Sequence, residues 1–249
     1  MHQEKRIALI KQLVTNQQEI TTKEIMERFN ISQDTARRDI ILLTERGEAR
    51  RTHGGILAIN YGTNVPNYED RLQKFTKQKI RIAMAALNYI KNDGVYFIDV
   101  STILLKLCQN LNKKVTVFTH SLDNSFALAE QPEVSVNLFG GRLHHKNRFF
   151  YGLDVMEKIN DLVFDVAFVA ASGIDERGIY FVNEEDAEIV QRVVKHSRKV
   201  ILVAENHKFD NHSFYRGSEM KDIDVFITDK NLSTEQRAFF SNDTRIEIV

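Results

Sequence analysis

The chain has 249 residues, 43% hydrophobic and 27% charged, so it is long enough for two domains that each bury a core. Its 34 basic and 34 acidic side chains cancel, which excludes a polybasic protein and a generally acidic, disordered one. No apolar run is long enough for a transmembrane helix, so we expect a cytoplasmic protein with no membrane partner. The single cysteine, Cys108, falls in a helical apolar pattern and is expected to be a core thiol in a reducing compartment.

Three helices are predicted in the first 50 residues. Apolar residues recur at helical spacing between Ile7 and Val14. A capping box formed by Thr21 and Glu24 begins a second helix, and Ser32 caps a third after a three-residue turn. Two helices joined by so short a turn predict a helix-turn-helix.

A basic segment with two glycines follows these helices and is expected to form a wing. The sequence therefore predicts a winged helix-turn-helix domain over residues 1–58, with the helix-turn-helix itself at about 20–39. A polar stretch containing one of the two prolines comes next, and it predicts a linker over residues 59–76.

The outward side chains of the third helix are suited to reading DNA, because Arg and Gln form bidentate hydrogen bonds with guanine and adenine. Alternatively, Arg37 and Arg38 form a solvated face paired with Asp34 and Asp39. The matching offsets of cap, turn, apolar face and basic wing favour DNA binding. The expected DNA contacts are Thr21, Thr22, Ser32, Gln33, Thr35, Arg37, Arg38, Arg50, Arg51 and His53.

Residues 77–249 alternate short β-rich runs with helical patterns, beginning with an apolar helical pattern that includes Ile80 and Met84. Such alternation predicts an α/β domain with a mostly parallel, doubly wound sheet. Strands are expected near 95–99, 115–119, 134–139, 163–171, 200–204, 225–228 and 245–249, with helices near 77–91, 102–111, 122–130, 153–161, 184–197 and 233–241.

Ligands of an open α/β sheet bind at the carboxyl ends of its strands, and the loops there are polar in this sequence. Hydroxyls and amides at helix N-termini bind phosphate, basic side chains neutralise it, and carboxylates accept sugar hydroxyls. Each residue also has an ordinary explanation as a helix cap, a turn or a surface charge. Together they suit a small phosphorylated polyol. The expected effector-binding residues are Asp99, Ser101, Thr102, Thr119, Ser121, Gly140, Gly141, Arg142, Asp175 and Lys208.

Residues 3–58 resemble the N-terminal domain of the DeoR family of bacterial transcriptional regulators. The matching residues are Ser32-x-x-Thr35-Ala36-Arg37-Arg38-Asp39-Ile40, Gly47 and Arg51-Thr52-His53-Gly54-Gly55. The resemblance continues through the second domain, which in this family is a sugar-phosphate sensor resembling ribose-5-phosphate isomerase in fold. The usual Asp-x-Gly-Thr-Thr appears here as Asp99-Val100-Ser101-Thr102-Ile103, the usual Thr-Asn-Ser as Thr119-His120-Ser121, and Glu205 stands where Asp is common.

The sequence therefore predicts a transcriptional regulator, more specifically a repressor of sugar-uptake or sugar-metabolism genes. It would bind double-stranded operator DNA as a homo-oligomer, dimer or tetramer, and respond to a phosphorylated sugar. A sugar-phosphate isomerase-like enzyme is the alternative, with a carboxylate such as Asp99 or Glu184 as base. The fused DNA-binding module favours a sensor without catalytic residues. One cysteine and no helical His-x-x-x-His pair argue against a metal site, and no cofactor is expected.

Overall fold

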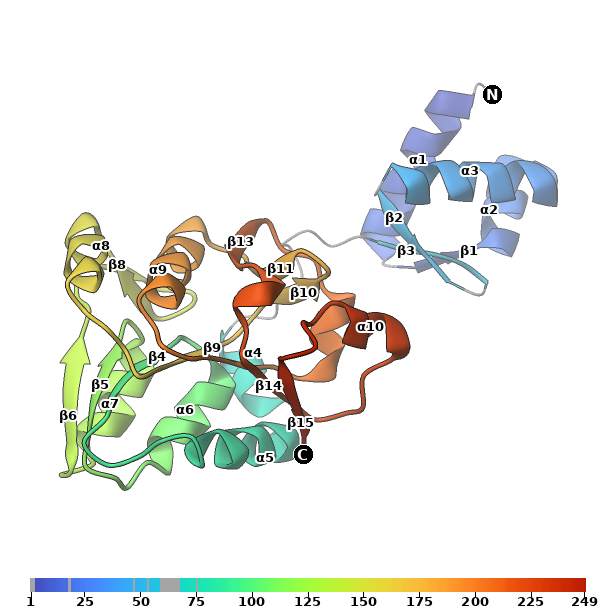
Figure 1. The fold of residues 1–249 in the computed structure, drawn as a ribbon. Coiled ribbons are helices and arrows are strands. Elements are labelled where there is room, and N and C mark those ends of the chain that lie inside the picture. Colours follow the sequence, from blue (N-terminus) through green and yellow to red (C-terminus); the bar gives the residue numbers. More distant parts are fainter. Residues whose placement is uncertain (1–2, 18, 47, 53, 59–67, 75) are drawn as a thin grey trace. The chain divides into compact units, whose positions relative to one another are not determined.

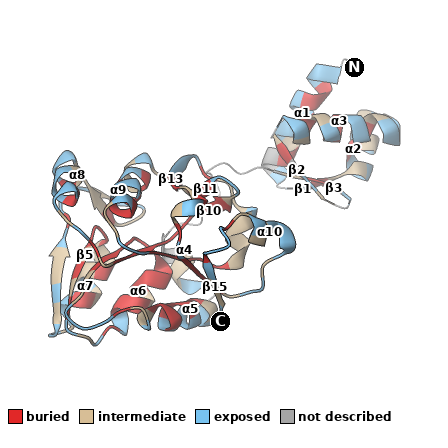
Figure 2. Cartoon of the chain, viewed as in Figure 1, coloured by how far each residue is buried: buried red, intermediate tan, exposed pale blue. Residues whose placement is uncertain are grey.

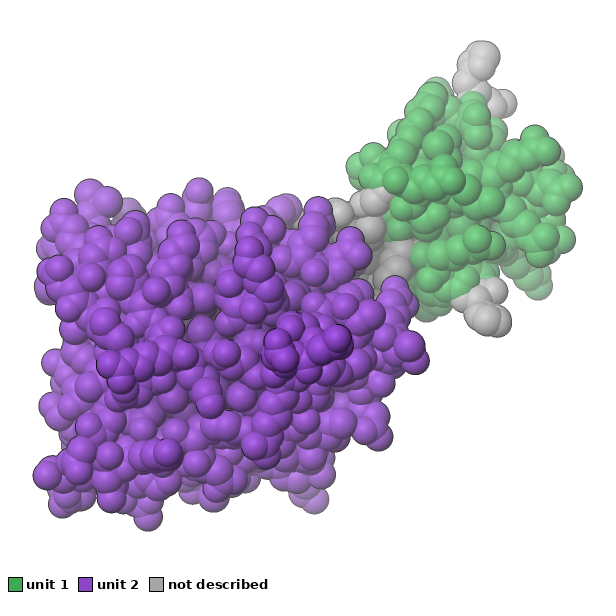
Figure 3. Space-filling model, in the orientation of Figure 1, with its two compact units in different colours: residues 1–63 green, residues 64–249 purple. Residues whose placement is uncertain are grey.

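Helices α1 (Gln3–Gln17), α2 (Thr22–Phe29) and α3 (Gln33–Glu45) form most of the first of two units (Figure 1). The computed structural model describes residues 3–17, 19–46, 48–52, 54–58, 68–74 and 76–249. The two units divide between Thr63 and Asn64 (Figure 3). Gly47, expected to end the third helix, lies outside the described residues.

Local capping signals place α2 and α3 where the sequence predicts them. The Thr21 hydroxyl accepts a hydrogen bond from the Glu24 amide, and the Glu24 carboxylate accepts one from the Thr21 amide. The Ser32 hydroxyl accepts a hydrogen bond from the Thr35 amide. These bonds satisfy backbone donors that a helix start would otherwise leave unpaired.

Three short antiparallel strands complete the first unit. They are β1 (Glu19–Thr21), β2 (Ala49–Arg51) and β3 (Gly55–Ala58), in the order β1-β3-β2. The β2–β3 hairpin is the expected wing, whereas β1 was not predicted from its three residues. Gly55 is required where the wing meets β1, because a Cβ there would lie 2.2 Å from the carbonyl oxygen of Ile20. A winged helix-turn-helix is therefore confirmed.

A buried ion pair joins α1 to α3. The Arg6 guanidinium donates from Nε to Asp39 Oδ2 (2.6 Å) and from Nη2 to Asp39 Oδ1 (3.0 Å). Asp39 is fully buried and Arg6 is nearly so. The surrounding core consists of apolar residues from all three helices, including Ile10, Ile25 and Leu43.

A seven-stranded parallel sheet forms the centre of the second unit, in the order β15-β14-β12-β9-β4-β5-β6. All seven strands were predicted, and the α/β fold is confirmed. They are β4 (Val95–Ile98), β5 (Val115–Thr119), β6 (Val134–Leu138), β9 (Val166–Val169), β12 (Val200–Val203), β14 (Val225–Thr228) and β15 (Arg245–Ile248).

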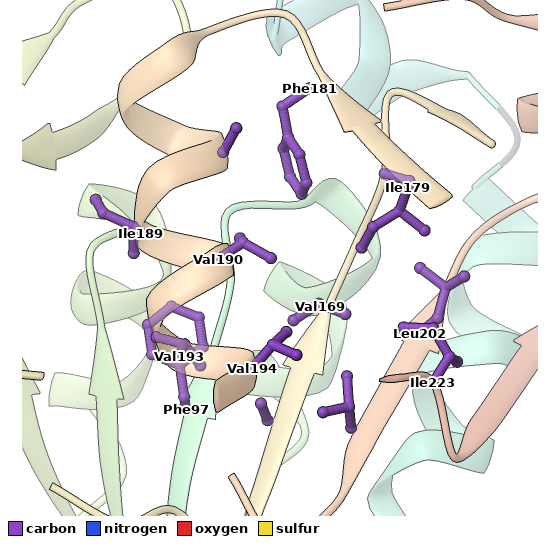
Figure 4. Close-up of a cluster of buried hydrophobic side chains, with 14 of the residues drawn as sticks. Phe97, Val169, Ile179, Phe181, Ile189, Val190, Val193, Val194, Leu202 and Ile223 are labelled. Atoms are coloured by element: carbon purple, nitrogen blue, oxygen red, sulfur yellow. The ribbon is translucent and has the colours of Figure 1, made fainter. Parts of the chain in front are cut away.

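Helices cover both faces of this sheet. One face packs against α5 (Thr76–Leu87), α6 (Thr102–Gln109) and α7 (Leu122–Ala129), and the other against α8 (Leu153–Asn160) and α9 (Glu184–Lys195). Buried residues are concentrated in the strands and on the helix sides that face them (Figure 2). On the second face, Val190 and Val193 of α9 pack with Phe97 and Val169 of the sheet (Figure 4). A further short helix, α10 (Thr234–Ala238), lies near the C-terminus.

In the second unit, the structure differs from the sequence prediction in three respects. Residues 68–73 of the expected linker form helix α4 (Tyr68–Gln73). The inward face of α5 contains Lys79 and Ile82, while Ile80 and Met84 are 40% and 46% exposed. Antiparallel strands that were not predicted are β7 (Arg142–His144), β8 (Phe149–Tyr151), β10 (Gly173–Asp175), β11 (Gly178–Phe181) and β13 (Tyr215–Ser218).

Among the described residues, no helix is long and apolar enough to cross a membrane.

Candidate functional site

A shallow groove of about 320 Å³ lies between α2, α3 and the wing. Thr22, Gln33, Arg37 and Arg51, all expected DNA contacts, line this groove together with Lys23. The amide of Thr22 donates to the carbonyl of Gly54, which fixes the wing beside the start of α2 (2.8 Å). The structure thus brings cationic and hydrogen-bonding side chains from three separate elements to one face, as a nucleic-acid interface requires.

The other expected DNA contacts lie around the same elements. Arg38 is exposed on α3 outside the groove, and Thr21, Ser32 and Thr35 take part in the helix caps. The Arg50 side chain and the whole of His53 lie outside the described part of the chain.

Of the alternative reading of Arg37 and Arg38, the structure contradicts the pairing with Asp39, while both arginines are exposed, as a solvated face would be. Asp39 points inward to Arg6, and no described residue forms an ion pair with Arg37 or Arg38. Both guanidinium groups are therefore available for an external anionic partner.

The main cavity of the second unit has a volume of about 520 Å³ and lies beyond the carboxyl ends of β4, β9 and β12. From β4 the chain proceeds to β5 and β6 on one side of the sheet, and then returns to place β9 on the other side of β4. Such a reversal leaves a crevice between the outgoing loops, where ligands of open α/β sheets bind. Its lining includes Arg71, Lys74, Lys79, Ser101, Thr102, Ile103, Asn147, Ser172, Asn183, Asp186, Glu205, His207, Lys208 and Asn211.

Basic side chains gather at one part of this lining. The Lys79 ammonium, on α5, donates to the carbonyl of Arg71, at the end of α4, and lies 3.8 Å from a Glu205 carboxylate oxygen. Burial, together with the positive charges of Arg71 and Lys79, lowers the pKa of Lys208 to about 8, and Glu205 opposes the shift. Burial also lowers the pKa of Lys79 and, with help from Lys208, that of His207. The cations therefore repel one another in a poorly solvated space, and the acids that offset this repulsion are Glu205 and, at His207, Asp229.

A buried acidic and imidazole cluster lies beside the cavity. His120, directly after β5, places Nε2 3.0 Å from Asp186 Oδ1 and 3.7 Å from Asp99 Oδ1. The ring stacks on Phe97, and its Nδ1 atom is buried without a hydrogen-bond partner. Burial raises the pKa of Asp99, and the Asp186 carboxylate adds to the shift while His120 opposes it.

Three of the expected effector-binding residues, Ser101, Thr102 and Lys208, line the cavity. Asp99 is fully buried, and its carboxylate accepts hydrogen bonds from the amides of Val100 and Ala170. Thr119 and Ser121 are also buried: the Thr119 hydroxyl donates to the Ile98 carbonyl, and Ser121 caps α7. Their side chains are thus engaged within the protein.

The remaining expected residues are not brought to this cavity. Gly140, Gly141 and Arg142 line a separate hollow of about 440 Å³ because they follow β6, an edge strand of the sheet. Asp175 lies in the β10–β11 hairpin, where Arg177 pairs with its carboxylate at 3.2 Å. The predicted single site is therefore only partly assembled in the structure.

Sequence reasoning missed much of the polar lining. Arg71 lies in the expected linker, and Lys79 occupies the buried face of α5. Asn147 accepts a hydrogen bond from Arg71 and donates one to Asn183, which draws the β7–β8 hairpin to the cavity. No sequence signal marked Lys79, because the predicted inward face of this helix contained Ile80 and Met84 and left the lysine toward solvent.

Comparison with known proteins agrees with this architecture. A model described as "DeoR-like helix-turn-helix domain" matches residues 6–61, and one described as "DeoR C terminal sensor domain" matches residues 74–230. The chain is 32% identical over 231 residues to the HTH-type transcriptional repressor GlcR of Bacillus subtilis, covering 92% of this chain and 90% of that protein. It is 28% identical over 253 residues to the lactose phosphotransferase system repressor of Lactococcus lactis, covering 99% and 98%.

Among relatives and solved structures, similarity also extends to three further proteins. Identity to the glycerol-3-phosphate regulon repressor of Escherichia coli is 27% over 232 residues, 92% of each chain. A D-ribose-5-phosphate isomerase solved with phospho-erythronic acid has a TM-score of 0.40 at 14% identity, over 53% of each chain. The sorbitol operon regulator SorC of Klebsiella pneumoniae has a TM-score of 0.36 at 14% identity, over 81% of this chain and 89% of that one. From the two family models and the full-length relatives, we conclude that the chain belongs to the DeoR family of DNA-binding transcriptional regulators.

Proposed function

We propose that this protein is a repressor of sugar-uptake or sugar-metabolism genes, and that a phosphorylated sugar bound in the main cavity changes its affinity for operator DNA. Relatives named as repressors of a lactose phosphotransferase system and of a glycerol-3-phosphate regulon support the class of target gene. The observation that carries the choice of effector is the gathering of Arg71, Lys79 and Lys208 at the main cavity.

A phosphate dianion would relieve the mutual repulsion of these cations. The lowered pKa values of Lys79 and Lys208 record the cost of holding both charges in the cavity, and a bound anion offsets that cost. The N-cap of α6, Ser101, and its first residues, Thr102 and Ile103, also line the cavity, and helix N-termini favour anions. Sugar hydroxyls could form hydrogen bonds with three polar side chains of the lining. The amides of Asn183 and Asn211 can donate or accept, and the carboxylate of Asp186 can accept.

The effector would act through the segment that leads to the DNA-binding unit. Helix α4 is the first described element after residue 67, and its Arg71 is held by Asn147 (3.1 Å) and by the Lys79 ammonium. An anion bound among these groups would shift α4 and α5. Because residues 59–67 connect α4 to the DNA-binding unit, this shift would also change the position of that unit. A hundredfold difference in affinity between the two arrangements corresponds to about 2.7 kcal/mol of coupling.

We further propose that the working form is a dimer or tetramer, because one winged helix contacts too few base pairs for useful specificity. Size-exclusion chromatography with light scattering would measure the assembly, and a monomer on and off DNA would contradict this part of the proposal.

The test is fluorescence anisotropy with the full-length protein on its own promoter and on promoters of neighbouring sugar operons. Salt and competitor DNA are held constant, because affinity falls steeply with salt. Sugar phosphates are added as a panel, beside the unphosphorylated sugars and inorganic phosphate. We expect specific binding that one sugar phosphate changes and its parent sugar does not.

The Lys208→Ala variant is compared with Lys230→Ala, which removes an exposed lysine outside the cavity lining. Loss of the response in the first variant alone supports the cavity as the site. Absence of specific DNA binding would overturn the proposed regulator. Turnover of a sugar phosphate would instead support the isomerase-like alternative.

A further inference from the structure

Asp99, His120 and Asp186 come from three distant parts of the chain and converge beside the main cavity. Asp99 follows β4, His120 follows β5, and Asp186 lies in the first turn of α9. Asp99 and His120 are fully buried, whereas Asp186 lines the cavity. We propose that these three side chains bind a divalent metal ion, zinc or manganese, at the edge of the cavity.

The geometry of the cluster suits such an ion. The His120 Nε2 atom lies 3.0 Å from Asp186 Oδ1 and 3.7 Å from Asp99 Oδ1, and one ligand atom of each residue lies within 4.8 Å of the others. Metal bonds of about 2.0–2.2 Å separate neighbouring ligand atoms by roughly 3.0–3.5 Å. An ion therefore fits between the three side chains after small rotations.

The Asp99 oxygens are held in place and keep lone pairs that a metal ion could use, and His120 Nε2 would bind the ion after losing the proton it shares with Asp186. The amides of Val100 and Ala170 donate to separate oxygens of Asp99, at 2.7 and 3.0 Å, which fixes this carboxylate across the ends of β4 and β9. Each oxygen accepts one backbone hydrogen bond and keeps a second lone pair. All polar contacts of the His120 ring pass through Nε2, the atom that faces both carboxylates.

The two carboxylates of the cluster also favour binding of a cation. Among the described residues, no Lys or Arg side chain pairs with Asp99 or Asp186 within 4.0 Å, so His120 is the only basic group between two poorly solvated carboxylates. Buried carboxylates are ordinarily paired or coordinate a metal. The competing arrangement is a proton shared between the imidazole and the carboxylates, and the experiment below separates the two.

The ligand set indicates the kind of ion. Imidazole suits zinc, and carboxylates suit manganese and magnesium, so a set of one imidazole and two carboxylates points to zinc or manganese. Because Asp186 lines the cavity, the open coordination position would face it.

The test uses the full-length protein, stripped with a chelator and desalted, without DNA or sugar phosphate. Isothermal titration with ZnCl₂ and MnCl₂, checked by elemental analysis after dialysis, should show about one ion per chain. We expect His120→Asn and Asp186→Asn to weaken binding by at least tenfold, since even outer-shell changes cost that much. His145→Asn and Glu188→Gln, which change an exposed histidine and an exposed acid of α9, should bind as the wild type does.

Failure of the wild type to retain either ion would overturn the proposal in favour of a shared proton. Equal binding by the wild type and the two cluster variants would also overturn it and place the ion elsewhere. If the cluster variants fail to fold, the absorption spectrum of the Co²⁺-loaded wild type replaces them. We expect a spectrum of nitrogen and oxygen ligation that saturates at one Co²⁺ per chain. A spectrum of the aqueous ion would contradict the site. None of these readouts depends on the proposed effector or operator.

Discussion

Replacing Arg6 with alanine should destabilise the DNA-binding unit without altering its DNA-facing surface. The variant removes both hydrogen bonds to Asp39, at 2.6 and 3.0 Å, and leaves that fully buried carboxylate with the Gln3 amide at 3.2 Å. Removing one partner of a buried pair costs about 3–5 kcal/mol, since the other charge stays in a poorly solvated place. A unit of 63 residues has a total stability of roughly 3–9 kcal/mol. The free energy lost on replacing Arg6 is thus comparable with the total free energy of unfolding of the unit.

Differential scanning calorimetry of the full-length protein measures this effect. The transition of the first unit should fall by roughly 12–40 °C, at 4–8 °C per kcal/mol for a domain of this size, while that of the second unit stays unchanged. Arg46→Ala is the matched control because Arg46 also links α3 to α1, through Glu4 at 2.7 Å, but does so on the surface. Exposed ion pairs contribute little to stability because solvent screens them, so this variant should unfold almost as the wild type does.

A double replacement separates the ion pair from mere loss of side-chain volume. Arg6→Met combined with Asp39→Leu exchanges both charges for apolar groups and should recover most of the stability. Operator binding should be lost in Arg6→Ala and largely regained in the double variant. If Arg6→Ala unfolds at the same temperature as Arg46→Ala, the argument from buried charge is wrong.

Three further variants and one titration test the remaining assignments. Arg38→Ala should abolish specific operator binding with normal unfolding, and a gel shift of wild-type strength would refute the recognition-helix assignment. Lys208→Ala should keep DNA affinity but blunt the effector response, and an unchanged response would place the ligand elsewhere. The pKa of Lys208 is lowered to about 8, so its side chain is charged below this pH and neutral above it. The affinity for sugar phosphate, measured by isothermal titration calorimetry, should therefore fall between pH 7 and 9. An affinity that does not change with pH would exclude Lys208 as the phosphate partner. Gly55→Ala should lower the melting temperature of the first unit, because its Cβ meets the Ile20 carbonyl oxygen at 2.2 Å; an unchanged melting temperature would show that the wing shifts freely.

Elements with strong local signals could be predicted from the sequence. The capping box at Thr21 and the cap at Ser32 are hydrogen bonds between residues three apart, so the chain encodes them without help from the rest of the fold. Buried parallel strands are similarly visible as short β-branched runs, and all seven were found. By contrast, β1 has only three residues and exists because β3 pairs with it.

The orientation of α5 shows how a buried charged residue can mislead a periodicity argument. Hydrophobic periodicity assumes that charges face solvent, which would turn Ile80 and Met84 inward. Lys79 is instead buried, because its ammonium pairs with the Glu205 carboxylate and donates a hydrogen bond to the Arg71 carbonyl. Ile80 and Met84 are left partly exposed. The lysine that obscured the helix face is one of the cations of the candidate site.

The candidate site itself depends on strand order, which local pattern does not encode. The rule that ligands bind at carboxyl ends of strands applied equally to every predicted strand, and it therefore selected Gly140 and Arg142 as readily as Ser101 and Lys208. The reversal of strand order that creates the cavity lies between β4 and β9, with β12 next to β9, while β6 is at the edge of the sheet. Long-range pairing thus decides which strand ends meet. The same pairing brings His120 beside Asp186, 66 residues away, so a cluster with no recognisable spacing in the sequence becomes a compact set of ligands in the fold.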